Sequence, residues 1–173
     1  MGCRVSLIAL QGKSPEDVHL DFELEATGES FEIAVGPASC ASLPNGWNIL
    51  YFNESKLPED DAFRESSKGG KLLFNLVCET TMMSYATSWV DGAQIWSVLH
   101  DSNQGAEHLT TTGMLPPQFN GLRDALLKKQ ETSDGVDFVF DVPVDLFASL
   151  TGMRYDGSPA FDQPKPWQRL RQR

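Results

Sequence analysis

The chain has 173 residues, of which 40% are hydrophobic and 10% aromatic, and its formal net charge at pH 7 is −10. This composition is typical of one globular domain with a sizeable core, and it excludes an intrinsically disordered chain. The acidic excess repels a phosphate backbone, so the acidic body is not expected to bind nucleic acid, and it favours a basic protein partner instead.

The three cysteines, Cys3, Cys40 and Cys78, are odd in number and have no C-x-x-C spacing. This favours free thiols in a reducing compartment over a disulfide framework or a thiolate metal cluster. Gly2 and Cys3 match a lipidation pattern, but the apolar alternation that begins at Val5 indicates a strand there. The sequence has no apolar run of about 18 residues and no cleavable leader, so we expect a cytoplasmic protein without membrane contact.

The first half of the chain predicts strands separated by short helices. Ser14 and Pro15 form a helix start, residues 44–46 (Pro-Asn-Gly) form a turn, and the Gly69-Gly70 pair precedes a long apolar run. The expected strands are 3–11, 31–35, 47–53 and 71–79, and the expected helices are 18–22 and a short one that begins within 57–61.

Residues 82–101 predict a β-hairpin, because Asp91-Gly92 suits a type I′ turn between two alternating runs. If Val90 pairs with Ala93, the two-residue period of a strand sorts the side chains onto two faces. One face is aromatic and holds Met83, Tyr85, Thr87, Trp89, Gln94, Trp96, Val98 and His100. The other face is small and holds Ser84, Ala86, Ser88, Val90, Ala93, Ile95, Ser97 and Leu99.

The second half predicts helices that cover this small-residue face. A helix is expected after Pro116-Pro117, a strand at 136–140, and a second helix from Pro143 to about Gly152. The apolar side of the first helix consists of Phe119, Leu122, Leu126 and Leu127. We therefore expect an α+β domain over residues 1–155, followed by an extended basic C-terminal arm over 156–173. The domain should have a mostly antiparallel sheet of about five to seven strands, with two to four helices packed on one face.

Few residues suggest chemistry. His100, Asp101, Glu107 and His108 border a polar loop, and imidazole and carboxylate groups can bind zinc or manganese, although this spacing is no established ligand pattern. Alternatively, these four side chains cap turns or are exposed to solvent. Cys78 lies in an apolar run and is expected to be a buried thiol. The sequence has neither a G-x-S-x-G elbow nor a glycine-rich phosphate loop, so we expect no cofactor.

Several stretches carry a resemblance to other proteins. Residues 89–101 and 140–144, together with 150–156 (Leu-Thr-Gly-Met-Arg-Tyr-Asp), resemble stretches of small uncharacterised bacterial proteins, which imply no established activity. The acidic composition is similar in character to that of immunity proteins, which neutralise toxins by occupying a basic active-site surface. That likeness concerns composition and transfers no residue.

The leading hypothesis is a non-enzymatic protein-binding module, of the kind that inhibits a basic bacterial toxin. Its expected partner-binding residues are Glu59, Asp60, Asp61, Asp91, Tyr85, Trp89 and Trp96, the aromatic ones lining either a groove or the core. One alternative is a small-ligand or metal-dependent enzyme with a site near His100, Asp101 and His108. Another is a homo-oligomer subunit, in which basic residues 165–173 dock on an acidic neighbouring copy.

Overall fold

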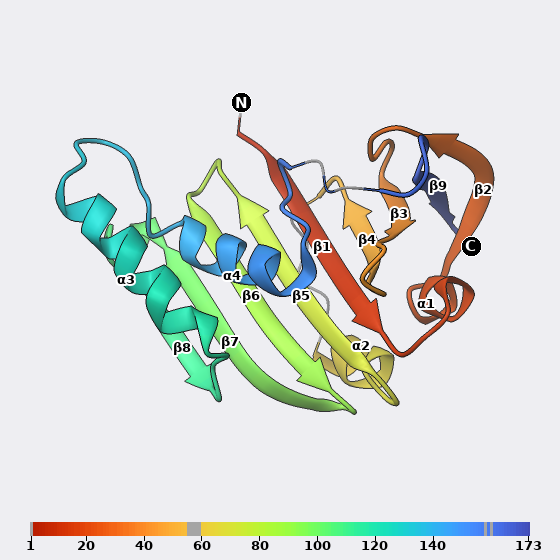
Figure 1. The fold of residues 1–173 in the computed structure, drawn as a ribbon, viewed down its shortest axis with the longest axis horizontal. Coiled ribbons are helices and arrows are strands. Elements are labelled where there is room, and N and C mark those ends of the chain that lie inside the picture. Colours follow the sequence, from red (N-terminus) through yellow and green to blue (C-terminus); the bar gives the residue numbers. More distant parts are fainter. Residues whose placement is uncertain (1, 55–59, 158, 160) are drawn as a thin grey trace.

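The structure is a computed structural model, and it describes residues 2–54, 60–157, 159 and 161–173. These residues form a nine-stranded antiparallel sheet and four α-helices (Figure 1), so the α+β class is confirmed and the expected five to seven strands are too few. The strands are β1 Arg4–Gln11, β2 Leu24–Phe31, β3 Ala38–Ser42, β4 Asn48–Phe52, β5 Lys71–Cys78, β6 Met83–Val90, β7 Ala93–Asp101, β8 Thr110–Gly113 and β9 Trp167–Gln172. The helices are α1 Pro15–Asp21, α2 Asp60–Ser66, α3 Gln118–Glu131 and α4 Asp141–Thr151.

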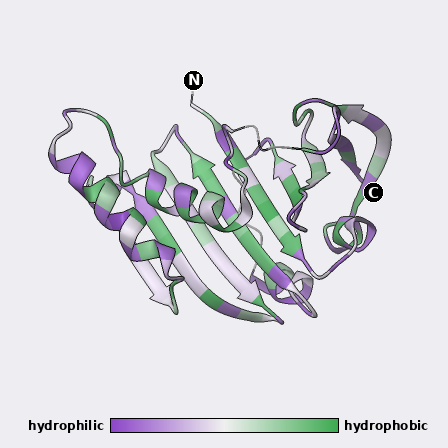
Figure 2. Cartoon of the chain, in the orientation of Figure 1, coloured by the Kyte–Doolittle hydropathy of each residue, from purple (hydrophilic) through white to green (hydrophobic). Residues whose placement is uncertain are grey.

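The sheet has the strand order β2-β9-β3-β4-β1-β5-β6-β7-β8, with β1 at its centre. Residues 5–10 of β1 are all buried, because both faces of the sheet are covered at this point. A strand buried on both faces has a nearly continuous apolar sequence, and the middle of the sheet is accordingly mostly hydrophobic in Figure 2. β2 and β8 are the two edges.

The helices divide between the two faces of the sheet: two of the four pack on one face, as expected, and the other two lie on the opposite face. α3 and α4 cover one face, where Phe119, Leu126 and Phe147 join the main core. α1 and α2 lie on the other face, where Val18 and Phe63 join a second core. Because α1 and α2 have only seven residues each, they cover far less of the sheet than α3 and α4 do.

The predicted hairpin is present, but a β-bulge changes which side chains share a face. Val90 pairs with Ala93 and Trp89 with Gln94, whereas Ser88 pairs with Trp96. The extra residue on β7 reverses the alternation from that point on. Trp96 therefore packs in the core beneath α4, while Tyr85 and Trp89 belong to the core of the α1 and α2 face. The prediction of a single aromatic face was wrong.

The C-terminal segment is part of the sheet, which corrects the expected basic arm beyond residue 155. β9 is hydrogen-bonded between β2 and β3, and Leu170 is buried. Two of the basic residues that suggested an arm, Arg169 and Arg171, form cross-strand ion pairs with acidic residues of β2. Arg171 Nε lies 2.6 Å from Glu25 Oε1, and Arg169 Nη1 lies 3.4 Å from Glu29 Oε2.

Two expected strands differ from the structure. The strand expected at 31–35 lies earlier, at Leu24–Phe31, and is followed by bends. Residues 136–140 contain no strand and instead form the turn that begins α4. There the Phe140 backbone N–H donates to Asp137 Oδ1 at 3.1 Å and the Asp141 N–H donates to the Phe138 carbonyl. This short apolar segment thus forms local hydrogen bonds in place of the backbone hydrogen bonds that would pair it with a neighbouring strand.

Gly113, at the end of edge strand β8, offers a test of the β7–β8 pairing. Its φ is +74°, and a Cβ there would lie 2.0 Å from the carbonyl oxygen of Ile95. Gly113→Ala should lower the free energy of unfolding by about 1–2 kcal/mol more than Gly28→Ala, because the edge strand must also move away. Gly28 has a φ of +83° and no atom within 4 Å of the added Cβ. Urea denaturation of both variants checks this, and equal losses would contradict the close pairing.

Candidate functional site

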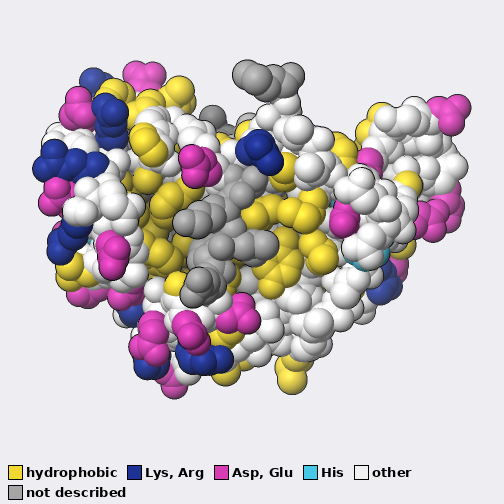
Figure 3. All heavy atoms as spheres, turned by 180° about the vertical axis from the view of Figure 1, so that it is seen from behind, with side chains coloured by type: hydrophobic (Ala, Val, Ile, Leu, Met, Phe, Trp, Pro, Cys, Tyr) yellow, Lys and Arg dark blue, Asp and Glu magenta, His cyan; other side chains and the backbone are white. Residues whose placement is uncertain are grey.

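A groove of about 870 Å³ lies on the face of the sheet that α1 and α2 only partly cover. Alternate side chains of six strands point to the same side and form its floor. The apolar floor residues are Ile8, Leu24, Ala38, Phe52, Phe74 and Leu170. Figure 3 views this side of the molecule and shows apolar side chains gathered across its middle, with charged side chains mainly toward the edges.

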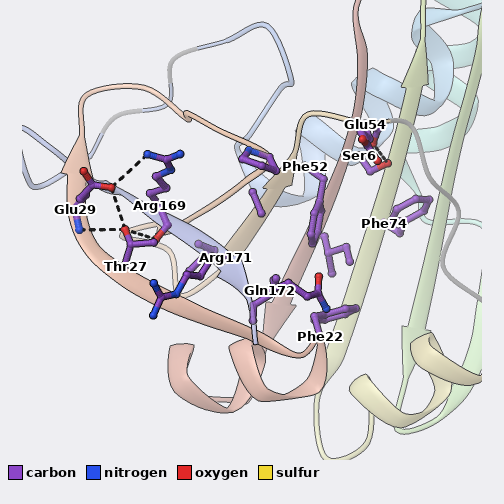
Figure 4. Close-up of a pocket in the computed structure, with 15 residues that line it drawn as sticks. Ser6, Phe22, Thr27, Glu29, Phe52, Glu54, Phe74, Arg169, Arg171 and Gln172 are labelled. Carbon is purple, nitrogen blue, oxygen red and sulfur yellow. Dashed lines mark hydrogen bonds and ion pairs between the residues drawn. The ribbon is translucent and has the colours of Figure 1, made fainter.

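Charged and polar side chains surround one end of the groove, between β2 and β9 (Figure 4). There Thr27 Oγ1 donates to the Arg169 carbonyl oxygen at 3.2 Å, and the Arg169 guanidinium faces Glu29. Arg171 also lines the groove. Toward β1, the Ser6 hydroxyl donates to the Glu54 carbonyl oxygen at 2.9 Å. The rim thus offers charges of both signs around an apolar floor.

This groove is suited to binding. Its size falls within the range of about 300–1,000 Å³ for ligand sites, and its lining is mostly apolar with a few polar groups. None of the described residues that line it is a cysteine, histidine or lysine. The apolar floor can recognise an apolar group, and the polar side chains around it can orient that group's polar ends.

The acidic candidates lie on α2 and at the tip of the β6–β7 hairpin. Asp60 and Asp61 are exposed in the first turn of α2, and Asp61 pairs with Arg64 at 3.0 Å. Asp91 is exposed at the hairpin tip, where its Oδ1 accepts from the Gly69 N–H at 3.0 Å. Glu59 lies outside the described residues. Arg64 thus neutralises part of this acidic surface.

The aromatic candidates do not form one surface. Trp89 is 4% exposed and lies beside Phe63, with ring centroids 6.0 Å apart, whereas Trp96 is 4% exposed in the opposite core. Tyr85 is half-buried, and its ring centroid lies 6.2 Å from that of Phe74, a floor residue of the groove. These residues therefore support the groove or the core and present little surface of their own.

The histidine region is held together by structural hydrogen bonds. His100 is fully buried, with Nε2 2.8 Å from Asp137 Oδ2 and Nδ1 2.8 Å from the His108 carbonyl oxygen. His108 Nδ1 accepts from the Asp101 N–H at 3.0 Å. Across the described ranges, no three His, Cys, Asp or Glu side chains are arranged to hold a metal ion. Both ring nitrogens of His100 are occupied, which leaves it no free base.

Hydrogen bonds of Asp101 and Glu79 shift their ionisation. The Gln104 side chain and the Asn103 N–H lower the pKa of Asp101, whose carboxylate caps the turn that follows β7. Glu79 accepts from the Cys3 N–H and from the Tyr155 hydroxyl, both at 2.7 Å, and these bonds lower its pKa. Burial and the same Glu79 contact raise the pKa of Tyr155. The carboxylates of Asp101 and Glu79 thus have structural roles: Asp101 caps a turn, and Glu79 holds the segments that contain Cys3 and Tyr155.

Cys78, expected to be buried, is 2% exposed on β5. Thr81 donates its hydroxyl hydrogen to the Cys78 sulfur at 3.0 Å.

Comparisons of the chain with models of protein families, with curated proteins and with solved structures found no match. None of the helices in the described ranges has the length and apolar character needed to cross a membrane. The resemblance to small bacterial proteins stays a prediction, and the geometry of the groove is the main support for a function.

Proposed function

We propose that the protein is a non-enzymatic binding protein that holds a basic protein partner at the groove beside α1 and α2, as an immunity-type inhibitor holds a toxin. The groove itself is the observation that supports this most. An apolar floor with a charged rim suits an aromatic or aliphatic anchor of a partner, the kind of contact that supplies most of the affinity in protein complexes.

The charge of the molecule favours a basic partner. A net charge of −10 steers a cationic protein toward the chain and raises its association rate, an effect that salt screens. In this proposal the groove supplies affinity, while the acidic surface, including Asp60, Asp61 and Asp91, supplies attraction at a distance.

The alternatives receive less support from the contacts. An enzyme centred on His100 would need access to a side chain that is fully buried and bonded at both ring nitrogens. A homo-oligomer held by the C-terminal basic residues would need them free, yet Arg169 and Arg171 already pair with Glu29 and Glu25 of the same chain.

Replacing a floor residue by lysine tests the proposal, because the charge opposes both an apolar anchor and a basic partner. Phe52→Lys should lower the recovery of one basic protein from a lysate of the source organism at least about tenfold, as expected for a central anchor contact. Phe52 is half-buried in the groove. The matched control is Leu122→Lys, which makes the same charge change at a half-buried position on α3.

Thermal melting of both variants confirms that each is folded before capture. The proposal requires a protein that is retained by the wild type and by Leu122→Lys, lost from Phe52→Lys, and released as salt rises. Equal retention by Phe52→Lys, or no specifically retained protein, would contradict it.

A further inference from the structure

A second, smaller pocket of about 420 Å³ contains a thiol and an imidazole in contact. It lies where α1, β2, β3 and β9 meet the segment that leads into β9. His19 Nε2 lies 3.0 Å from Cys40 Sγ, and both residues line the pocket while only 8% of each is exposed. A nucleophile and a base within hydrogen-bond distance are the first requirement for nucleophilic attack on a carbonyl group.

The fold places these two side chains together from different elements. Ser14 caps α1 by accepting the Asp17 N–H, and the helix turns Val18 and His19 toward the sheet. On β3, Cys40 belongs to the same core as Val18 and therefore faces α1. The pocket opens here because Cys40 and Gln168 form the last pair in the β3–β9 ladder.

Two further groups complete the surroundings of the pair. Gln168 lines the pocket, and its side-chain Oε1 accepts from the Cys40 thiol at 4.0 Å, which orients the sulfur in the pocket. Glu16, three residues before His19 on α1, also lines the pocket.

The surroundings keep both groups neutral at rest. Burial, with a smaller effect of the Glu16 charge, raises the pKa of the Cys40 thiol to about 11. Burial lowers the pKa of His19, assisted by Arg173 and opposed by Glu16. At neutral pH the thiol therefore keeps its proton and the imidazole can accept it. The pair is suited to general-base assistance, in which proton transfer accompanies attack, rather than to a preformed thiolate.

We propose that Cys40 is a nucleophile with His19 as its general base, and that this pocket accepts the acyl group of a small activated ester or thioester. Cys40 Sγ attacks the carbonyl carbon and forms a C–S bond while its proton passes to His19 Nε2. The bond from the carbonyl carbon to the leaving oxygen or sulfur then breaks, and the leaving group takes the proton from His19. The product is a thioester on Cys40, and no oxidant or metal is required.

This activity uses residues outside the groove, so it can fail or succeed independently of the proposed partner binding. p-Nitrophenyl acetate serves as the probe, because acyl transfer releases coloured p-nitrophenolate and leaves one acetyl group on the protein. Peptide mass spectrometry should find that acetyl group on Cys40. Cys3→Ala, which removes a different and half-buried thiol, should react as the wild type does.

His19→Asn should slow acetylation of Cys40 at least about tenfold, in line with the usual contribution of a general base. The pH profile separates this role from a purely structural one. With His19 present, the rate should level off near neutral pH, because the pKa of His19 lies below its ordinary value of 6.5. Without it, the rate should keep rising toward the thiol pKa of about 11.

Circular dichroism at each pH confirms that the variants are folded. Three results would overturn the proposal: acetylation confined to Cys3, no acetyl group on Cys40 in the folded protein, or the same rate and pH profile for His19→Asn and the wild type.

Discussion

Arg154→Ala is expected to lower the free energy of unfolding at neutral pH by about 2–3 kcal/mol, because it leaves three neighbouring carboxylates without a counter-charge. The guanidinium pairs with Asp141 at 2.6 Å, with Asp145 at 3.0 Å, and with Asp156. The side chains of Arg154, Asp141 and Asp145 are about one-third exposed and that of Asp156 nearly half, so we expect a smaller loss than the about 3–5 kcal/mol of a fully buried pair.

The loss should depend on pH in a definite direction. Burial raises the pKa of Asp141 even with Arg154 beside it, and removing Arg154 should raise it further. A carboxyl group whose folded-state pKa is raised destabilises the folded protein above that pKa, and the penalty disappears as pH falls through it. The difference between variant and wild type should therefore be smaller at about pH 4 than at about pH 7.

Urea denaturation at the two pH values measures both effects. Arg123→Ala is the control, because its ion pair with Asp124 is more exposed and should contribute about 0.5 kcal/mol or less. Adding Asp141→Asn to Arg154→Ala should recover part of the lost stability. Equal losses for the two arginine variants, or a loss that does not change with pH, would contradict this account.

The Arg154 cluster gives residues 150–156 a structural role. In residues 150–156, Gly152 ends α4 with a φ of +80°, Arg154 binds two acidic residues of α4, and Tyr155 donates to Glu79. The side-chain contacts of Arg154 and Tyr155 hold the segment that follows α4 against the helix and against Glu79. The residues of this stretch therefore have a structural role and carry no information about a partner or a reaction.

Local patterns in the sequence predicted the hairpin, α3 and the end of α4, because turn residues and apolar periodicity determine these elements. The bulge in β7 was missed because a single extra residue leaves the apolar alternation on each side intact. Tyr85 and Trp96 were consequently assigned to the same face, although they lie in different cores.

Features that combine residues from distant segments could not be predicted from the sequence alone. The basic residues of β9 suggested a free arm, and their acidic partners on β2 lie about 140 positions earlier in the chain. The groove combines side chains of several strands, and the His19–Cys40 contact joins a helix to a strand. Such sites depend on strand order, which local periodicity does not determine.

His100→Ala is expected to lower the free energy of unfolding by about 3–4 kcal/mol, more than His108→Ala does, because it creates a cavity and leaves buried hydrogen-bond partners unpaired. His100 connects β7 to the His108 carbonyl oxygen and to Asp137, which in turn holds the first turn of α4 through the Phe140 N–H. His108→Ala should lose only about 1 kcal/mol, since the side chain is half-buried and accepts one backbone hydrogen bond.

Urea denaturation of the two histidine variants, with and without added zinc chloride, separates a structural role from a metal site at His100, Asp101 and His108. A structural role requires that His100→Ala be much less stable than His108→Ala and that zinc leave the wild-type stability unchanged. A metal that binds only the folded protein would instead raise the wild-type stability with its concentration, and would do so less in either variant. Zinc-dependent stability of that kind would return the histidine region to the centre of the functional question, because the present hydrogen bonds would have to rearrange to release two imidazole nitrogens.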